Sequence, residues 1–149
     1  MKRLLTLISI LILSTASSAE QNYEVGFGTN YGGVLGGTIN VDLNANTEVF
    51  VGLGAGFDGV TYVVGTKFWL NEKLRLSANY GYNCTVKTVS TTTTYKDYNG
   101  LNVGIGYAFG GRKSGAAIDL MLIDSSDCSE AAGSTESSSS AKIALGYRF

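Results

Sequence analysis

The chain has 149 residues, a formal net charge of −1 at pH 7, no histidine and no proline. Without histidine it has neither the usual general base of nucleophilic triads nor His-ligated zinc, so we expect neither chemistry. The near-neutral charge gives no sign of a nucleic-acid-binding surface. A hydrophobic content of 44% is too high for a disordered chain, and 20 glycines with only 15% charged residues depart from an average soluble domain. We expect one folded domain.

Residues 1–19 have the layout of a secretory signal peptide. Lys2 and Arg3 form a basic start, residues 4–13 form an apolar run, and small residues precede an expected cleavage after Ala19. The apolar run is too short for a transmembrane helix, which needs about 20 residues. We therefore expect an exported protein whose folded domain is residues 20–149.

Export bears on the two cysteines, Cys84 and Cys128. An exported chain can keep a disulfide, so we predict that these two residues pair. The alternative is two buried free thiols.

Hydrophobic residues alternate with small or polar ones through the whole of residues 20–149, and no segment shows a period of 3.6 residues. Near the C-terminus, for example, Leu145 and Tyr147 alternate with Gly146 and Arg148. This period of two predicts β-strands. We predict eight of them, near residues 22–30, 33–43, 47–57, 60–70, 74–88, 95–109, 115–124 and 140–149.

The apolar face of these strands is predicted to point outward. It carries aromatic residues at its ends, as the interfacial girdles of membrane-spanning barrels do, whereas the opposite face is rich in glycine and suits a narrow lumen. Strands of about 9–11 residues also fit a tilted crossing of a bilayer. The predicted fold class is all-β, an eight-stranded antiparallel up-and-down transmembrane β-barrel. The aromatic residues expected outside are Tyr23, Phe57, Tyr62, Phe68, Tyr80, Tyr82, Tyr107, Phe109, Tyr147 and Phe149.

An even number of strands places both termini on one side, which we take as periplasmic. Short turns are then expected at residues 44–46, 71–73 and 110–114, and external connections at 31–32, 58–59, 85–97 and 125–139. Both cysteines fall on the external side in this topology. A disulfide between the third and fourth external connections would stabilise the fold by about 2–4 kcal/mol.

Eight charged residues fall on the inward face, and four acidic groups balance four basic ones. Because charges away from water must be paired, we interpret them as an internal salt-bridge network. The alternative is a proton or ion pathway, since inward glycines leave volume for water. The eight residues are Glu24, Asp42, Glu48, Lys67, Arg75, Asp119, Lys142 and Arg148.

The pattern resembles the small eight-stranded outer-membrane barrels of Gram-negative bacteria, such as the transmembrane domain of outer membrane protein A and the Ail-type adhesion and invasion proteins. The resemblance rests on the signal peptide, the eight alternating segments and the C-terminal residues Ile143, Leu145, Tyr147 and Phe149. These last residues look like the signal read by the barrel-assembly machinery, although an ordinary terminal strand would look similar. The resemblance implies insertion by that machinery into the cell outer membrane, in contact with its lipid and lipopolysaccharide.

Enzymes with this architecture, the outer-membrane lipid A deacylases and palmitoyltransferases, resemble small barrels with a catalytic histidine. This chain has no histidine, and the serines of residues 134–140 have no base to activate them. We therefore expect no catalysis, no cofactor and no metal.

The two long external connections are the best remaining indication of function. The third is rich in threonine and other β-branched residues, so it is predicted to extend the fifth and sixth strands into a projecting edge that a partner strand could join. The fourth carries Asp127, Glu130 and Glu136 and no basic residue. We predict a structural or adhesion-like role, with a host or surface ligand at these connections, unless they are merely solvated. The sequence is also compatible with a narrow pore, or with a soluble exported barrel that binds an apolar ligand.

Overall fold

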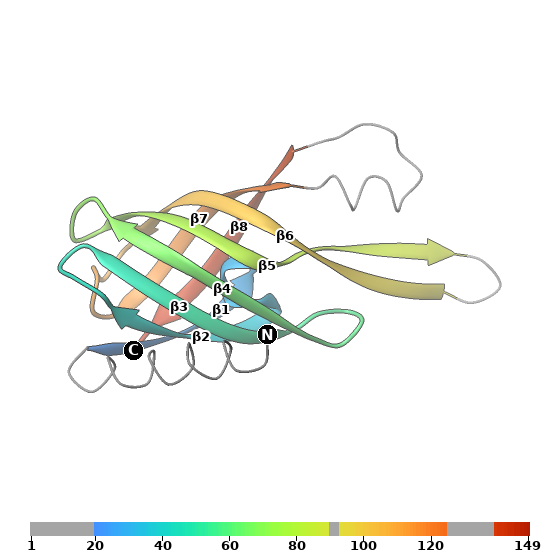
Figure 1. The fold of residues 1–149 in the computed structure, drawn as a ribbon, viewed down its shortest axis with the longest axis horizontal. Helices are drawn as coiled ribbons and strands as arrows, with labels where there is room; N and C mark the ends of the chain where they lie inside the picture. The colour runs from blue at the N-terminus through green and yellow to red at the C-terminus, as the bar shows by residue number, and fades with distance from the viewer. Residues whose placement is uncertain (1–19, 90–92, 125–138) are drawn as a thin grey trace, which may run out of the picture.

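A computed structural model describes residues 20–89, 93–124 and 139–149 (Figure 1). Within these ranges the chain forms one closed antiparallel barrel, in which each strand pairs with its neighbours in sequence and the last strand returns to the first. This confirms the predicted all-β, eight-stranded up-and-down barrel. The elements are β1 (Gln21–Gly28), η1 (Thr29–Tyr31), β2 (Gly33–Asp42), β3 (Thr47–Ala55), β4 (Val60–Trp69), β5 (Leu74–Val89), β6 (Thr93–Ala108), β7 (Gly115–Asp124) and β8 (Ser139–Arg148).

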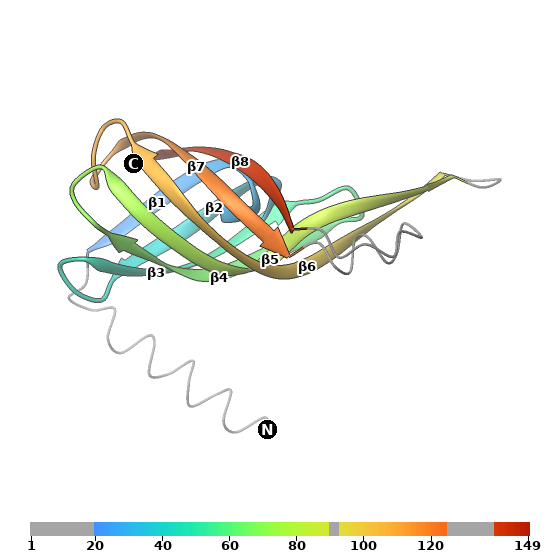
Figure 2. The ribbon, with the colours of Figure 1, turned by 90° about the horizontal axis from the view of Figure 1, so that it is seen from above.

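The two ends of the barrel differ in their connections (Figures 1 and 2). One end, which we call the turn end, holds the start of β1, the end of β8 and three short turns. The other, the hairpin end, holds the β1–β2, β3–β4 and β5–β6 connections. Two of the short turns are closed by asparagine. Asn44 Oδ1 accepts hydrogen bonds from the backbone N–H groups of Asn46 and Thr47 at 2.9 Å. In the next short turn, Asn71 Oδ1 accepts them from the backbone N–H groups of Lys73 and Leu74.

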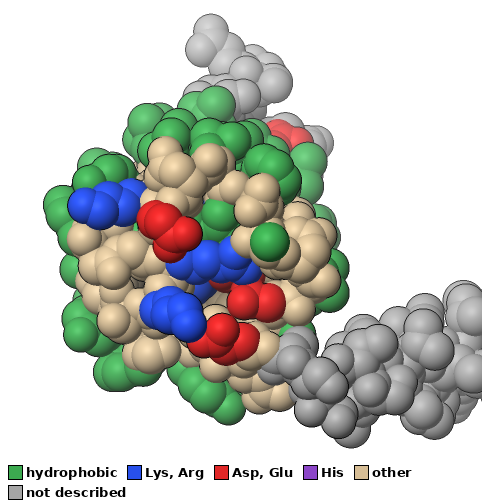
Figure 3. All heavy atoms as spheres, turned by 90° about the vertical axis from the view of Figure 1, so that its left-hand side faces the viewer, with side chains coloured by type: hydrophobic (Ala, Val, Ile, Leu, Met, Phe, Trp, Pro, Cys, Tyr) green, Lys and Arg blue, Asp and Glu red, His purple; other side chains and the backbone are tan. Residues whose placement is uncertain are grey.

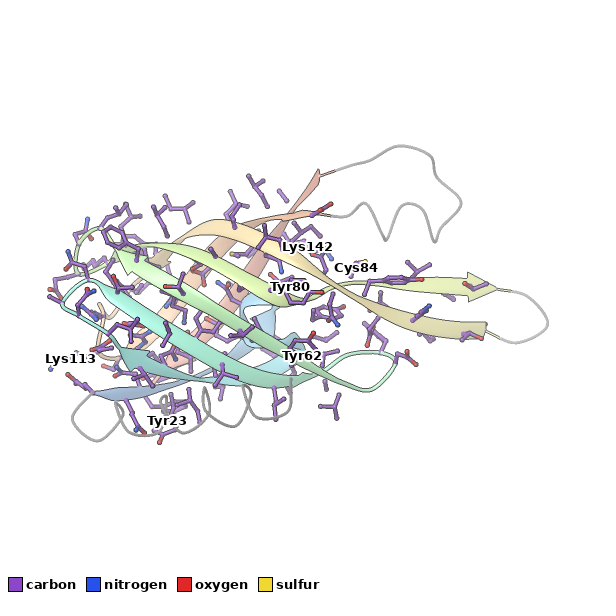
Figure 4. The ribbon with its side chains drawn as sticks, in the orientation of Figure 1. Tyr23, Tyr62, Tyr80, Cys84, Lys113 and Lys142 are labelled. Carbon is purple, nitrogen blue, oxygen red and sulfur yellow. The ribbon has the colours of Figure 1, made fainter. Side chains whose placement is uncertain are left out.

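Side chains alternate between the lumen and the exterior along the strands, as predicted. Apolar residues project outward, and Tyr23, Tyr62 and Tyr80 point away from the barrel wall (Figure 4). The inward side chains of Phe50 and Trp69 are buried. Nine of the ten aromatic residues expected outside are exposed.

Tyr82 is the exception, because it is buried although it was expected on the exposed face. Only 7% of this residue is exposed. A β-bulge between Tyr82 and Cys84 shifts the β5–β6 register, and the Tyr82 hydroxyl lies 2.9 Å from Thr85 Oγ1. Tyr82 keeps its regular partner Asn99, and the extra residue breaks the strict alternation beyond it, from Cys84 onward.

The first connection also differs from the prediction. The first strand ends at Gly28 instead of residue 30, and Thr29–Tyr31 form a 3₁₀ helix in place of an open external turn at residues 31–32. All three residues of η1 are at most 1% exposed. The connection therefore folds into the hairpin end of the lumen.

Strands β5 and β6 are longer than the others and extend beyond the barrel wall (Figures 1 and 2). Their mutual pairing runs out to Val89 and Thr93. The predicted extension of these strands by a threonine-rich segment is confirmed. The signal peptide and the fourth external connection, including Asp127, Glu130 and Glu136, lie outside the described residues and stay predictions.

Candidate functional site

The turn-end half of the lumen contains a network of ion pairs centred on Glu24 of β1. Its carboxylate accepts Lys67 Nζ at 2.8 Å, Arg75 Nη1 at 3.0 Å and Arg148 Nε at 2.7 Å. These four side chains come from β1, β4, β5 and β8 and are almost completely buried. One carboxylate thus joins strands on opposite sides of the barrel.

Glu48 of β3 is a second centre. Arg148 Nη2 lies 2.6 Å from Glu48 Oε2, and the indole N–H of Trp69 donates to Glu48 Oε1 at 2.6 Å. Arg112, from the β6–β7 turn, reaches into the mouth of the barrel and pairs with both Glu48, at 3.1 Å, and Asp42, at 2.7 Å. The guanidinium groups of Arg148 and Arg112 also lie over the Trp69 ring, 5.2 and 5.9 Å from its centre.

Asp119 of β7 completes the network by pairing with Arg75. Arg75 Nε donates to Asp119 Oδ1 at 2.9 Å and Nη2 to Oδ2 at 2.8 Å, the bidentate geometry that a planar guanidinium favours. Gly106 of β6 leaves room for this pair, because a Cβ there would collide with the Asp119 carboxylate.

The eight residues predicted inside therefore separate into three groups. Six form the buried part of the network: Glu24, Glu48, Lys67, Arg75, Asp119 and Arg148. Asp42 is 22% exposed at the mouth and joins through Arg112. Lys142 takes no part in it, and donates to the backbone oxygen of Asn83 at 2.8 Å.

The network is electrically neutral, because its four basic residues include Arg112 instead of the predicted Lys142 and balance the four acidic ones. Acidic and basic side chains gather at the centre of the turn end, surrounded by hydrophobic side chains (Figure 3). Arg112 was not among the predicted inward residues because it lies in a turn, where no alternation indicates which way a side chain points. The residues of this lumenal charge network are Glu24, Asp42, Glu48, Lys67, Arg75, Arg112, Asp119 and Arg148.

The hairpin-end half of the lumen is lined by amide side chains and by Lys142, away from the charge network. Asn79 donates to Asn30 of η1 at 2.7 Å and accepts a bond from Asn102 at 2.9 Å, so amides link η1 to β5 and β6. Arg75 Nη2 donates to the Tyr31 hydroxyl at 3.5 Å and connects the two halves.

Inward glycines in this half make room for Tyr31. A Cβ at Gly26 would lie 2.7 Å from the Tyr31 ring, and one at Gly146 would collide with the Tyr31 phenol. The glycine-rich face that suggested volume for water thus accommodates a tyrosine side chain.

At the hairpin end, Asp97 of β6 anchors the base of the extended β5–β6 hairpin. Its Oδ1 accepts the Thr85 hydroxyl at 2.6 Å, and its Oδ2 accepts the backbone N–H of Asp58 at 2.9 Å. The rings of Phe57 and Tyr95 stack nearby, with centroids 5.6 Å apart. The β3–β4 turn therefore supports the hairpin.

Beyond this base the hairpin leaves the barrel. The pairing of β5 with β4 stops at Gly81, and that of β6 with β7 stops at Asn102. Residues 85–89 pair with residues 93–97, and Tyr98 and Asn99 pair with Cys84 and Tyr82, so that a two-stranded ribbon results. We call residues 85–89 and 93–99 the projecting hairpin.

Cys84 is buried at the base of this hairpin (Figure 4). It lies at the hairpin end, as the predicted topology requires. Cys128 lies outside the described residues, so the disulfide stays a prediction.

The remaining predicted residues lie on the outer surface. Ile143, Leu145, Tyr147 and Phe149 of the C-terminal segment are all exposed on the apolar exterior. In the part of the chain that the structure describes, no cluster of three or more metal-ligating side chains occurs, and no helix is long and apolar enough to cross a membrane. Comparison with protein-family models, with curated proteins and with solved structures found no match.

Proposed function

We propose that this protein is an integral outer-membrane barrel whose exterior faces lipid. The observation that carries this proposal is the inversion of an ordinary soluble fold: large apolar side chains cover the outside, and the charged groups are buried inside. Exposed examples come from every strand, and soluble monomers rarely expose contiguous apolar surface beyond a few hundred Å². A closed barrel also leaves no sheet edge in the hydrocarbon, which a bilayer requires.

The orientation follows from the connections. Short turns face the periplasm and longer connections the outside in barrels of this class, so we assign the turn end to the periplasm and the hairpin end to the cell surface. Resemblance to small Gram-negative barrels supports export by the signal peptide, delivery by the barrel-assembly machinery and contact with lipopolysaccharide.

The lumen supports a structural role over a pore. Eight strands leave space for little more than side chains, and here ion pairs fill one half while η1 and its amide partners fill the other. We propose that the network holds the wall together from inside and that the protein is not an enzyme.

The projecting hairpin supports a role in surface interaction. It is rich in β-branched residues, it is fixed at its base by Asp97, and its two strands extend past the ladders to β4 and β7. Such a ribbon can accept an extended polypeptide by strand addition. The partner that suits the edge of the projecting hairpin is a host or other surface protein that presents an extended segment.

A pair of valine substitutions tests the location of the exterior. Val51, in the middle of β3, and Val60, at the hairpin-end start of β4, are 56% and 83% exposed. Val51→Arg is expected to destabilise the barrel in lipid vesicles by about 2–4 kcal/mol, and Val60→Arg, near the interface, by about 0–1 kcal/mol. Urea unfolding measures both. Equal, small effects would show that the β3 exterior faces water.

Shortening the hairpin tests the interaction role. A variant in which residues 86–96 are replaced by a two-residue turn keeps all pairing within the barrel. We expect it to fold like the parent chain, with the same heat-dependent gel mobility, and cells that display it to lose binding to polypeptide-coated surfaces. Unchanged binding by the correctly folded variant would contradict the role of the hairpin.

A further inference from the structure

The segment that plugs the hairpin end of the lumen interrupts a strand that its sequence would continue. Outward residues Tyr23, Val25 and Phe27 are followed at the same spacing by Thr29 and Tyr31. In the structure η1 turns both of these side chains inward, where they are at most 1% exposed.

The pairing around η1 is irregular on both sides. On the β2 side, the register shifts between Gly26 and Gly28. Without that shift Thr29 would face Gly33, and a three-residue loop ending in Gly32 would close the hairpin. Gly32 already has the left-handed conformation, with φ 78°, that such a loop needs at its last position.

On the β8 side, the pairing with β1 stops at Phe27 and Leu145, although β8 continues to Ser139. Continuing the same register by two residues places Thr29 opposite Ile143. The existing strands thus offer Thr29 regular partners on both sides.

The inward position of η1 is also imperfectly satisfied. Thr29 Oγ1 and Asn30 Nδ2 are buried and have no hydrogen-bond partner among the described residues. Gly28, at φ 102°, makes the inward turn, and a Cβ at this position would meet Ala144 Cβ at 2.9 Å. The turn into the lumen therefore depends on glycine at residue 28.

From these observations we propose that η1 is a displaceable plug. In the second state β1 continues through Thr29 between β2 and β8, Tyr31 leaves the space beside Gly26 and Gly146, and the hairpin-end half of the lumen opens to the outside. The lumenal charge network stays in place, because none of its ion pairs involves η1.

Disulfide trapping distinguishes the two states, in a background carrying Cys84→Ser and Cys128→Ser. Thr29 faces the lumen and Ile143 is 63% exposed on the exterior, so Thr29→Cys with Ile143→Cys can bond only in the extended state. Val25→Cys with Tyr147→Cys is the matched control, because these residues are directly opposite each other on β1 and β8. We expect complete bonding of the control pair and slower, measurable bonding of the 29/143 pair.

Glycine substitutions make the test decisive. Gly28→Ala should accelerate bonding of the 29/143 pair about fivefold or more, because a non-glycine residue at positive φ strains the plugged state. Gly59→Ala is the control: this residue has φ 149°, lies in the β3–β4 turn and has no atom within 4 Å of an added Cβ, so it should not change the rate. No bonding of the 29/143 pair while the control pair bonds fully, or equal acceleration by both substitutions, would overturn the proposal. The experiment does not depend on whether the exterior faces lipid, so its failure would leave the proposed location intact.

Discussion

Removing the charge of Glu24 is expected to be among the most damaging conservative substitutions in this barrel. Glu24→Gln keeps the size of the side chain but leaves Lys67, Arg75 and Arg148 with less negative charge around them. Arg75 retains Asp119 and Arg148 retains Glu48, whereas Lys67 keeps only neutral partners, the side-chain oxygen of Asn40 at 2.7 Å and the ring of Phe50. Removing one partner of a buried ion pair costs about 3–5 kcal/mol, so we expect a loss of that size in the free energy of unfolding.

Urea unfolding in lipid vesicles measures this loss, and Trp69 reports it by fluorescence because its indole contacts the network directly. Glu20→Gln is the matched control: its pair with Lys113 is exposed at 3.5 Å and is expected to contribute less than about 1 kcal/mol. Adding Lys67→Met to Glu24→Gln should restore much of the stability, because it removes the buried cation that has lost its carboxylate partner. A Glu24→Gln variant as stable as the control, or a double variant with no recovery, would show that the charge of Glu24 does not stabilise these buried cations.

Three further predictions concern single contacts. Trp69→Phe removes the hydrogen bond to Glu48 and should lower the free energy of unfolding by about 1.5–3 kcal/mol. The gel mobility of folded and unfolded bands measures this change, and a loss below that range would mean that the indole N–H contributes little. Asp97→Ala should free the projecting hairpin, increasing amide hydrogen exchange at residues 85–89 and 93–99 roughly tenfold or more while leaving β3 and β7 unchanged, and equal exchange in both proteins would contradict the anchoring role. Cys84→Ser should abolish a reductant-dependent gel shift and lower stability by about 2–4 kcal/mol if Cys84 pairs with Cys128; a parent chain whose mobility ignores reductant would show that they do not pair.

The alternation of residues was sufficient to predict the barrel, its strand order and most of its inward side chains. Each strand pairs with its neighbours, so a period of two fixes which residues face the lumen once closure is assumed. The same pattern placed Glu24, Lys67 and Arg148 inside, where they meet. The distances between them could not be predicted, because they depend on the stagger between strands, and the sequence of one strand does not encode that stagger.

The errors arise where the backbone departs from a regular strand. The bulge after Tyr82 shifts the β5–β6 register, and the turn at Gly28 buries Thr29 and Tyr31 although the sequence still alternates there. Arg112 enters the lumen from a turn through the length of its own side chain. Lys142 faces inward as predicted but lies too far toward the hairpin end to reach the network, because the face of a residue does not fix its height in the barrel.

Fractionation of cells that express the full chain, combined with gel electrophoresis of heated and unheated samples, shows whether the barrel lies in the outer membrane. We expect recovery in the outer membrane and a folded band whose mobility changes on heating. Recovery of a folded protein in the soluble periplasm would contradict this expectation, because the exposed apolar exterior would then need a partner other than lipid.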